Sequence, residues 1–420
     1  MINVDYRQRM GELVDARTAA ERLGVDVRTL YAYVSRGALR RVPGPDGRSS
    51  RYDSDELGLL ARRSRPRTLP RPAASIDLVI ATRVSTVTDG VVRYRGTDVL
   101  DLVAAGTPFE AVAELLWKAD AAEGPAWQLP VGRASSTGLL LAALGTDVPV
   151  AQRFAAVVAS VSDAFGNSGP LDWPAWGRFL IAALVEASGP VPGVGGTDPA
   201  APLDPESDSG ADSNVARRLW RRWSPLRPTA PRVRALNTAL VVLAEHELAL
   251  STLAVRVAAS ARAAPPGCVL AGLGALSGAL HGDAPRLVQE RLLGLRAGEV
   301  HHGGNDAGAR LGFGHSVHRH GDPRTDPLLQ AVYPIATPAD RDLIQQAARG
   351  GEPGYPAPAP PNSDFALGAL CHVARMPPQA ATAIFAVART AGWIAHAAEE
   401  YAEFRLRFRG RAVLPVRSRR

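Results

Sequence analysis

Helical periodicity over most of the chain is the feature that most constrains its fold. After Asp98, apolar residues recur at helical spacing over 108–119, 136–144, 150–165, 174–187 and 232–263. Just before this region, Asp89-Gly90 separates two β-prone runs and predicts a hairpin. The pattern predicts an all-α region that starts near residue 76 and contains one small hairpin before Asp98.

Three features of the sequence bear on the compartment in which the protein works. The apolar run from Cys268 to Leu280 is rich in glycine and shorter than the ~18 residues of a membrane span, so we expect a buried helix there. Cys268 and Cys371 are the only cysteines, which is typical of a reducing compartment. The first thirty residues contain five acids and no long apolar core, so no secretory signal is expected. We expect a cytoplasmic protein with no membrane association.

The segments poor in large apolar residues suggest the domain divisions. Residues 189–214 are rich in Pro, Gly, Asp and Ser, and predict a disordered insertion. The run "SRPRTLPRP" cannot continue a helix and predicts an extended linker, which we assign to residues 65–75. A small N-terminal domain over residues 1–64 should therefore precede the helical region.

The N-terminal domain has the pattern of two short helices. We expect a helix from Thr18 to Leu23, a turn that ends at Asp26, and a second helix from Val27 to Arg36. Asp26 is a suitable N-cap because its carboxylate can accept the free amide hydrogens of the first turn. A turn or short wing then leads to a third helix over 54–63. The small core is expected from Ala19, Leu23, Val25, Leu30 and Val34, which leaves Arg28, Thr29, Tyr31, Tyr33 and Arg36 facing outward.

Most of the chain's positive charge lies in the same segment. Residues 1–72 hold fifteen arginines against nine acids, which is +6 of the net +7. Such an excess is typical of nucleic-acid contact or of a solubilising arm. The runs "AAERLGVDVRTLYAYVSRG" and "RSSRYDSDEL" resemble the winged helix-turn-helix of the MerR and excisionase type, whose second helix enters the major groove. The resemblance implies DNA binding through Arg28, Thr29, Tyr31, Tyr33 and Arg36; the alternative is a scaffold or dimer contact.

Three short segments carry residues suited to proton transfer. His281 lies at a helix end in "ALSGALHGDAP", His315 follows Gly312-Phe313-Gly314, and Asp364 begins a helix in "PNSDFALGAL". Two imidazoles and a carboxylate can serve as acids and base if they converge. Zinc is the alternative use of histidines, but their spacing is not the i,i+4 of a helical metal site, so we expect no metal.

Six motifs together resemble those of citrate synthases, in order and in spacing. They are "YRGTDVLDL…TPFEAVAELLW", "LAEHELALSTLAVRVAAS", "LSGALHGDAP", "GFGHSVHRHGDPR", "PNSDF" and "FAVARTAGWIAHAAEE". The resemblance implies an all-α fold with a large domain over 76–281 and 373–420, and a small domain over 282–372 that closes over the substrates. It also implies a homodimer or higher even oligomer. The implied enzyme is an acyltransferase whose partners are an acyl-CoA and oxaloacetate, with no cofactor besides the coenzyme A of the substrate.

The resemblance also implies a role for each site residue. Asp364 would remove a proton from the acyl-CoA, His281 would hold the enol oxygen, and His315 would polarise and protonate the oxaloacetate carbonyl. Oxaloacetate is a dianion and needs cations of fixed geometry, which arginine supplies through its planar fork. The family positions assign oxaloacetate to His246, Arg324, Arg389 and Arg409, and the CoA phosphates to Arg319.

The chain departs from the family pattern beside the site. Ala249-Leu250 stand where an Asn is usual, which removes a polar group and could change substrate choice, and Arg409 is followed by Gly instead of Pro. Three functions stay open: citrate synthesis from acetyl-CoA, 2-methylcitrate synthesis from propionyl-CoA, and a DNA-binding regulator that uses the fold as a metabolite sensor. One methylene is worth only about 1–3 kcal/mol in a pocket, so sequence alone does not separate the first two.

Overall fold

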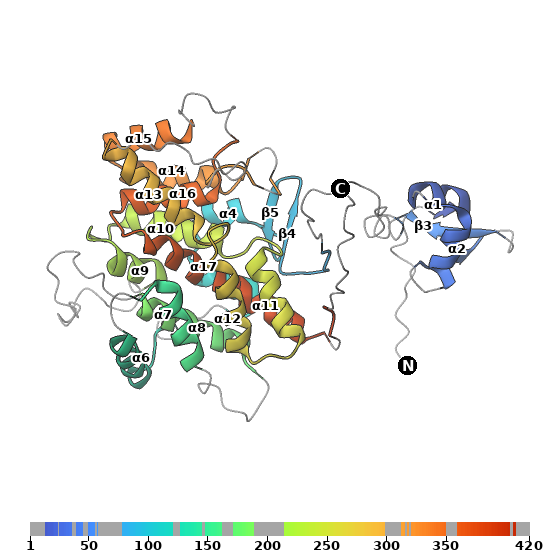
Figure 1. Cartoon of the computed structure of the whole chain (residues 1–420), viewed down its shortest axis with the longest axis horizontal. Helices are drawn as coiled ribbons and strands as arrows, with labels where there is room; N and C mark the ends of the chain where they lie inside the picture. The colour runs from blue at the N-terminus through green and yellow to red at the C-terminus, as the bar shows by residue number, and fades with distance from the viewer. Residues whose placement is uncertain are drawn as a thin grey trace, which may run out of the picture. The chain divides into compact units, whose positions relative to one another are not determined.

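The structure, a computed structural model of residues 1–420, forms two compact units, residues 1–80 and 81–420. We describe each unit by itself (Figure 1). The description covers all residues except 1–12, 24, 36–38, 45–48, 55–56, 58–77, 121–126, 145–147, 162–170, 189–213, 299–311, 316, 319–320, 350–358, 404–405 and 409–420. The predicted disordered insertion therefore lies outside the described residues, apart from Asn214.

The first unit packs two helices on a small antiparallel sheet of order β1-β3-β2. Each helix begins at an aspartate cap: Asp15 Oδ1 accepts from the amide of Thr18 at 2.8 Å, and Asp26 Oδ1 from that of Thr29 at 2.6 Å. The Asp26 cap was expected from the sequence. The elements are β1 (Leu13–Asp15), α1 (Ala16–Leu23), α2 (Val27–Ser35), β2 (Val42–Pro43) and β3 (Ser50–Asp53).

The small core of this unit agrees with the sequence pattern except at one tyrosine. Ala19, Leu23 and Leu30 are buried, and the other two expected core residues pack against them. Tyr33 was expected to face outward but is partly buried against this core, because it lies one helical turn after Leu30 on the face that packs inward.

The remaining candidates on α2 differ in exposure. Arg28 and Tyr31 are exposed, Tyr31 by 49%, and Thr29 is partly buried at the cap. Arg36 lies outside the described residues, as does the expected third helix apart from Ser54 and Leu57.

The second unit is a bundle of helices with one three-stranded sheet at its side (Figure 1). Its strands are β4 (Ser85–Thr88), β5 (Val91–Tyr94) and β6 (Thr97–Asp98). Its helices are α4 (Val99–Ala104), α5 (Phe109–Trp117), α6 (Val131–Leu144), α7 (Val150–Ser160), α8 (Trp173–Ala187), α9 (Val215–Trp223), α10 (Ala230–Leu243), α11 (Leu250–Ser260), α12 (Pro265–Leu276), α13 (Ala284–Arg296), α14 (Thr325–Val332), the 3₁₀ turn η4 (Tyr333–Ile335), α15 (Pro338–Ala348), α16 (Ser363–Val373) and α17 (Gln379–Tyr401).

The predicted hairpin is present between β4 and β5. Its turn residues, Asp89 and Gly90, both have positive φ, 53° and 79°, as a two-residue hairpin turn of the primed type requires. Aspartate and glycine are the residues that tolerate this conformation best.

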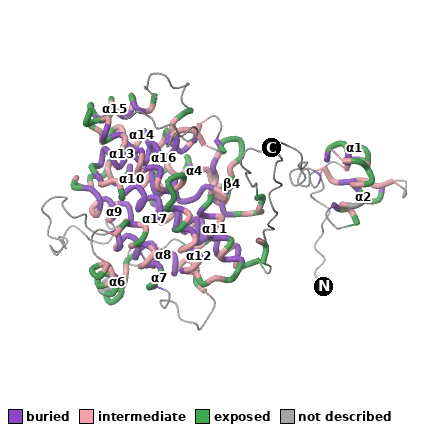
Figure 2. Tube along the Cα trace, in the orientation of Figure 1, coloured by how far each residue is buried: buried purple, intermediate pink, exposed green. Residues whose placement is uncertain are grey.

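Helix α17 forms the centre of the second unit. Almost all of its side chains are buried, and it packs against α5, α8, α10, α11 and α12. Figure 2 shows buried residues along α17 and along the neighbouring α10. A helix that is apolar on all sides must be covered by other helices on all sides. The small alanine side chains of α17 let these helices approach closely.

One expected helical stretch is broken. The pattern over 232–263 continues without interruption, yet the structure has α10 and α11 with residues 244–249 between them. Glu247 in this break has φ +50°, outside the helical region. The break turns the polar segment Glu245–Glu247 away from a helical path, and His246 lies in it.

No described helix is long and apolar enough to cross a membrane.

Candidate active site

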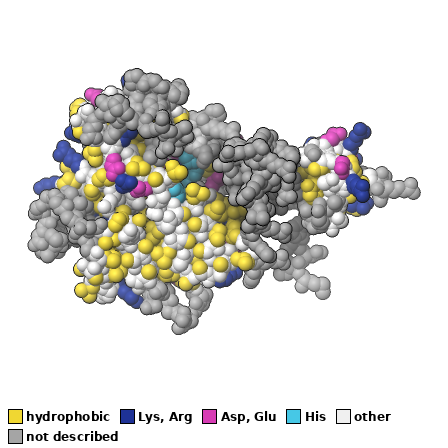
Figure 3. Space-filling view, viewed as in Figure 1, with side chains coloured by type: hydrophobic (Ala, Val, Ile, Leu, Met, Phe, Trp, Pro, Cys, Tyr) yellow, Lys and Arg dark blue, Asp and Glu magenta, His cyan; other side chains and the backbone are white. Residues whose placement is uncertain are grey.

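Six of the predicted site residues come from five separate segments of the second unit. His246 lies between α10 and α11, and His281 in the turn between α12 and α13. His315 and Arg324 lie in the chain before α14, Asp364 is the second residue of α16, and Arg389 is in the middle of α17. Histidine side chains gather near the centre of the face drawn in Figure 3.

One buried cation links these residues electrostatically. Besides burial, the charge of Arg389 acts on the pKa of each of His246, His281, His315 and Asp364. The contacts agree with this: the His246 and His315 rings are 4.9 Å apart, and the His281 ring and the Arg389 guanidinium both lie against the Phe385 ring, so these segments meet in one region.

The loop before His315 is joined to the start of α16. Asn362 Nδ2 donates to the carbonyl of Gly314 at 2.8 Å, the amide of Asn362 donates to the carbonyl of Gly312 at 2.9 Å, and the amide of Gly314 donates to Pro360 at 2.8 Å. Gly312 has φ +85°, and a Cβ there would lie 2.6 Å from Val288 Cγ2. The motifs "GFGH" and "PNSDF" therefore fold as one structural element.

Asp364 has the properties of a general base. Asn362 Oδ1 caps α16 by accepting from the amides of Asp364 and Phe365, so the Asp364 carboxylate is not used as the cap. That carboxylate accepts no hydrogen bond from any residue in the described part of the chain. Burial raises the pKa of Asp364 to about 6, against the opposing charge of Arg324. A carboxylate of this kind is ionised near pH 7 and is a stronger base than an exposed aspartate.

The tautomer of His315 is set by the backbone. Its Nδ1 accepts from the amides of Val317 at 3.1 Å and His318 at 3.3 Å. Burial, followed by the charge of Arg324, lowers the pKa of His315 to about 4, so the ring is neutral near pH 7. Its one proton must then be on Nε2, where it can be donated to an acceptor in the site.

His281 is held by a hydroxyl. Its Nε2 lies 2.8 Å from Ser251 Oγ, and Trp393 Nε1 donates to the same oxygen at 3.3 Å. The indole N–H can only donate to this oxygen, and His281 Nε2 is the one acceptor that the Ser251 hydroxyl meets among the described residues, so its hydrogen is assigned to Nε2. Burial, followed by the charge of Arg389, lowers the pKa of His281 to about 4. The neutral ring then carries its proton on Nδ1, as a second donor.

Arg324 is fixed by a carboxylate two residues before it. Asp322 accepts from Arg324 Nε and Nη2, both at 2.8 Å, in a bidentate pair, and also accepts from the amide of Ser363 at 3.0 Å. Although burial opposes ionisation of Asp322, the Arg324 guanidinium holds the pKa of that carboxyl well below its usual range. The pair leaves Nη1 of Arg324 outside the fork.

Arg389 is buried with an unused donor. Its Nε donates to the carbonyl of Leu243 at 2.9 Å, and its guanidinium lies 4.9 Å from the centre of the Phe385 ring. Its Nη1 has no hydrogen-bond partner among the described residues. Burial lowers the pKa of Arg389, although guanidinium stays charged in proteins. A buried guanidinium with a free N–H is suited to an anionic ligand.

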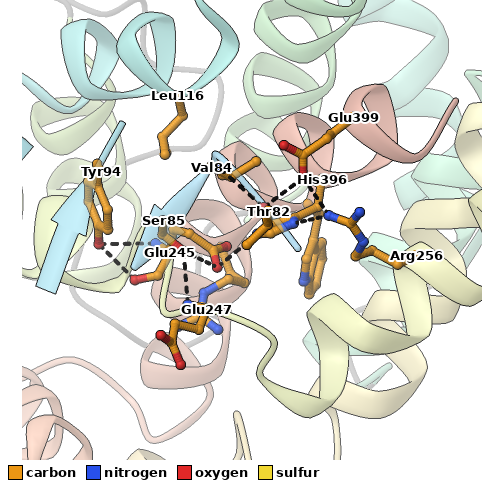
Figure 4. A network of polar contacts seen from close by, with 12 residues as sticks. Thr82, Val84, Ser85, Tyr94, Leu116, Glu245, Glu247, Arg256, His396 and Glu399 are labelled. Carbon is orange, nitrogen blue, oxygen red and sulfur yellow. Dashed lines mark hydrogen bonds and ion pairs between the residues drawn. The ribbon is translucent and has the colours of Figure 1, made fainter. Parts of the chain in front are cut away.

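The segment that carries His246 is held from two sides (Figure 4). From the sheet, Tyr94 Oη donates to the carbonyl of Glu245 at 2.8 Å, and Ser85 Oγ contacts both Glu245 and the amide of Glu247. From α17, His396 Nε2 lies 3.2 Å from Glu245 Oε1.

The His396 side of this network extends to further charges. Arg256 Nη1 faces His396 Nδ1 at 2.9 Å and Glu399 Oε2 at 2.7 Å. Because guanidinium cannot accept, His396 Nδ1 accepts and its Nε2 donates to Glu245.

Burial, with the charge of Arg324 next, lowers the pKa of His246 well below its ordinary value. His246 is therefore a neutral ring on a rigid support.

Three imidazoles of the site could also hold a metal. The ring nitrogens of His246, His315 and His318 lie within 4.8 Å of one another, and the ring centres are 4.9–5.0 Å apart. However, His246 and His318 share a 2.8 Å contact between their Nε2 atoms, and the Nε2 of His315 carries a proton. Arg324 and Arg389 also add two positive charges. This donor set fits an anion better than a cation, and the expectation of no metal stays a prediction.

Sequence analysis missed several residues that shape the site. Asp322 is in a quoted motif, and its bidentate pairing with Arg324 could have been suspected from the two-residue spacing. Ser251, His318 and Trp393 gave no separate signal. Two predicted residues, Arg319 and Arg409, lie outside the described residues.

Comparison with known proteins supports a common family. The family model for the citrate synthase C-terminal domain matches residues 77–411. A solved ternary complex of citrate synthase from Thermoplasma acidophilum with carboxymethyl coenzyme A and oxaloacetate has a TM-score of 0.64 and 21% identity, and covers 82% of this chain and 95% of that one.

Two curated relatives have different names at similar identity. Citrate synthase 2 of Bacillus subtilis is 32% identical over 214 residues, 49% of this chain and 56% of that protein. The 2-methylcitrate synthase 2 of Corynebacterium glutamicum is 29% identical over 176 residues, 40% of this chain and 46% of that protein. The chain thus spans about half the length of these two relatives.

Proposed function

Because the chain belongs to the citrate synthase family of acyltransferases, we propose that it condenses acetyl-CoA with oxaloacetate and water to give citrate and CoA. The observation that carries the proposal is the state of Asp364. Its carboxylate meets no hydrogen-bond donor among the described residues, burial raises its pKa to about 6, and the charges of Arg324 and Arg389 act on it. The two buried guanidiniums are suited to binding an anionic substrate. The carboxylate is suited to removing a proton from a carbon acid beside it.

The proposed first step is enolisation of the thioester. Asp364 takes a proton from the methyl carbon of acetyl-CoA, and the electron pair moves to the thioester oxygen. His281 stabilises that oxygen through its Nδ1–H, since Ser251 supplies a hydrogen bond to its other nitrogen. A neutral imidazole is the suitable donor because its pKa, lowered by burial to about 4, keeps it from being a competing base.

The proposed second step forms the carbon–carbon bond. The enol carbon attacks the ketone carbon of oxaloacetate, and the ketone oxygen takes the Nε2 proton of His315 to become a hydroxyl. Arg324, Arg389 and His246 bind the substrate carboxylates and carbonyl, with Arg389 Nη1 as an unpaired donor among the described residues. Water then hydrolyses the thioester of the product and releases CoA. These steps use carboxylate, imidazole and guanidinium groups, so we propose that no metal or redox cofactor takes part.

The experiment that tests the proposal is thiol release by the purified chain. Oxaloacetate is supplied with acetyl-CoA, propionyl-CoA or butyryl-CoA in parallel, and the products are identified by mass. The proposal is supported if thiol release is fastest with acetyl-CoA and the product has the mass of citrate. Absence of oxaloacetate-dependent thiol release with every thioester refutes it.

A second candidate is 2-methylcitrate synthesis from propionyl-CoA. The similarity to a 2-methylcitrate synthase supports this candidate. An added methylene changes binding by only about 1–3 kcal/mol, so the ratio of kcat/KM for the two thioesters decides between the candidates.

We also propose that the chain works as a homodimer or higher even oligomer in the cytoplasm. Leu250 and Val257 of α11 are 65% and 43% exposed, and the face around α11 and α12 in Figure 3 is largely hydrophobic. An exposed apolar face of this kind suits contact with a second copy. Buried free thiols at Cys268 and Cys371 suit a reducing compartment. Analytical ultracentrifugation would refute the oligomer if the chain sediments as a monomer at micromolar concentration.

The N-terminal unit is proposed to bind DNA through α2. Its support is the exposure of Arg28 and Tyr31 on a helix capped by Asp26, together with the basic excess of residues 1–72. The full chain could then act as a regulator that senses an acyl-CoA or oxaloacetate through the synthase fold. The alternative is a scaffold or dimer contact.

A further inference from the structure

A pocket in the larger unit lies apart from the active-site residues described above. It has a volume of about 190 Å³ and lies between the β4–β5 hairpin and helices α5, α8 and α17. By the same measure, one water needs only about 10–15 Å³. Its lining residues are Arg83, Arg95, Trp117, Lys118, Trp173, Ala395, Ala398 and Glu399. None of these has a part in the proposed condensation.

The lining carries three positive charges. Arg83 and Lys118 are exposed, and Arg95 is partly buried, where its Nε and Nη2 donate to the carbonyl of Leu116 at 2.9 and 2.7 Å. Within the described residues, none of the three side chains forms an ion pair. Lys118 is also the only lysine of the chain.

The one acid of the described lining is already engaged. Glu399 Oε2 accepts from Thr82 Oγ1 at 2.6 Å and from Arg256 Nη1 at 2.7 Å, and its Oε1 accepts from the amide of Arg83 at 2.8 Å. Burial alone would raise the pKa of Glu399, but the hydrogen bonds from Arg256 and Thr82 lower it, so the carboxylate stays ionised. Glu399 pairs with the buried Arg256 (Figure 4), which also pairs with Glu400, and the three cations of the described lining against this one acid leave an excess of positive charge.

Two indole rings form the apolar part of the lining. The N–H of Trp117 donates to the carbonyl of Ala391 at 2.9 Å, and the ring stacks on Trp127 with ring centres 5.7 Å apart, so only a small apolar part of this buried ring lines the pocket. Trp173 is partly buried and packs edge-on against Tyr401, with ring centres 5.0 Å apart. Cations beside aromatic surface are the usual combination for a ligand with a charged group and a planar one.

We propose that this pocket binds a small phosphate monoester that carries a planar ring. Arg83, Arg95 and Lys118 would contact the phosphate, since guanidinium and ammonium groups are the usual phosphate donors in proteins. The ring would pack against Trp173, beside the small exposed part of Trp117.

The test is calorimetric titration of the full-length chain with phenyl phosphate, in parallel with inorganic phosphate and benzyl alcohol. We expect saturable binding of phenyl phosphate, roughly tenfold tighter than that of inorganic phosphate because of the ring, and weaker at high salt. Arg83→Gln with Lys118→Gln removes two exposed charges and should weaken binding at least about tenfold. Arg133→Gln, an exposed arginine on α6, is the matched control and should leave it unchanged.

Two results would overturn the proposal. One is no heat of binding for phenyl phosphate at millimolar concentration. The other is equal affinity in the double variant and the Arg133→Gln control, which would assign binding to another surface. The titration needs no turnover, so its outcome is independent of whether the chain condenses acyl-CoA with oxaloacetate.

Discussion

The raised pKa of Asp364 predicts that the proposed base destabilises the folded protein. Its pKa moves from 3.8 to about 6 through burial, which corresponds to about 3 kcal/mol. The sign follows from proton uptake: between these two values the folded state holds the proton more tightly, so stability falls as pH rises. Below pH 4 both states are protonated and nothing is lost; above pH 6 the full penalty is present.

The Asp364→Asn substitution should therefore remove activity and add stability. The amide keeps the shape but cannot take a proton, so turnover should fall by about 10²–10⁴-fold. Unfolding of the variant should be less favourable than that of the wild type by up to about 3 kcal/mol at pH 8, and by about half as much at pH 5.

The measurement is paired urea unfolding of wild type and variant at several pH values, together with thiol release. Asp342→Asn, at an exposed position on α15, is the control and should show no comparable gain. The reasoning fails if Asp364→Asn keeps more than a tenth of turnover, or if its stability gain is the same at pH 5 and pH 8.

Three further predictions test other parts of the chain. His281→Ala and His315→Ala should each abolish turnover, but only His315→Ala should weaken the protection that oxaloacetate gives against thermal unfolding; equal weakening would contradict the assigned roles. Gly392→Ala should destabilise the fold by about 1–3 kcal/mol, because its Cβ would lie closer to the Glu245 carboxylate than van der Waals contact allows. The control Gly274→Ala has open space around it and should be neutral or slightly stabilising when the melting temperatures are compared. If residues 1–72 bind DNA, affinity in a filter-binding assay should fall steeply with salt and vanish on their removal; salt-independent binding would exclude the phosphate contacts.

The parts of the fold that were predictable depend on local sequence. The hairpin follows from Asp89-Gly90, because few residues accept the positive φ that the turn needs. The start of α2 follows from Asp26, whose side chain caps the nearest amides. Helix α9 was not predicted, although its buried residues Val215, Leu219 and Trp223 recur every four positions and could have indicated it.

The parts that were not predictable depend on contacts between distant segments. The periodicity over 232–263 gave no sign of the break at residues 244–249, because the contacts that hold it come from Ser85, Tyr94 and His396. Tyr33 is a different case, because its spacing of three residues from Leu30 could have indicated the inward face of α2.

The chemical state of the site follows the same division. Sequence motifs indicated which residue types are present, but a histidine acts as donor or acceptor according to what its other nitrogen contacts. For His315 that contact is the backbone of its own loop, and for His281 it is Ser251, thirty residues earlier. Both contacts leave a proton on the nitrogen opposite, so two neutral donors accompany a carboxylate that burial has made a stronger base. A condensation reaction needs one base and separate hydrogen-bond donors. Here the donors are fixed by the group that contacts the other nitrogen of each imidazole, not by the imidazole alone.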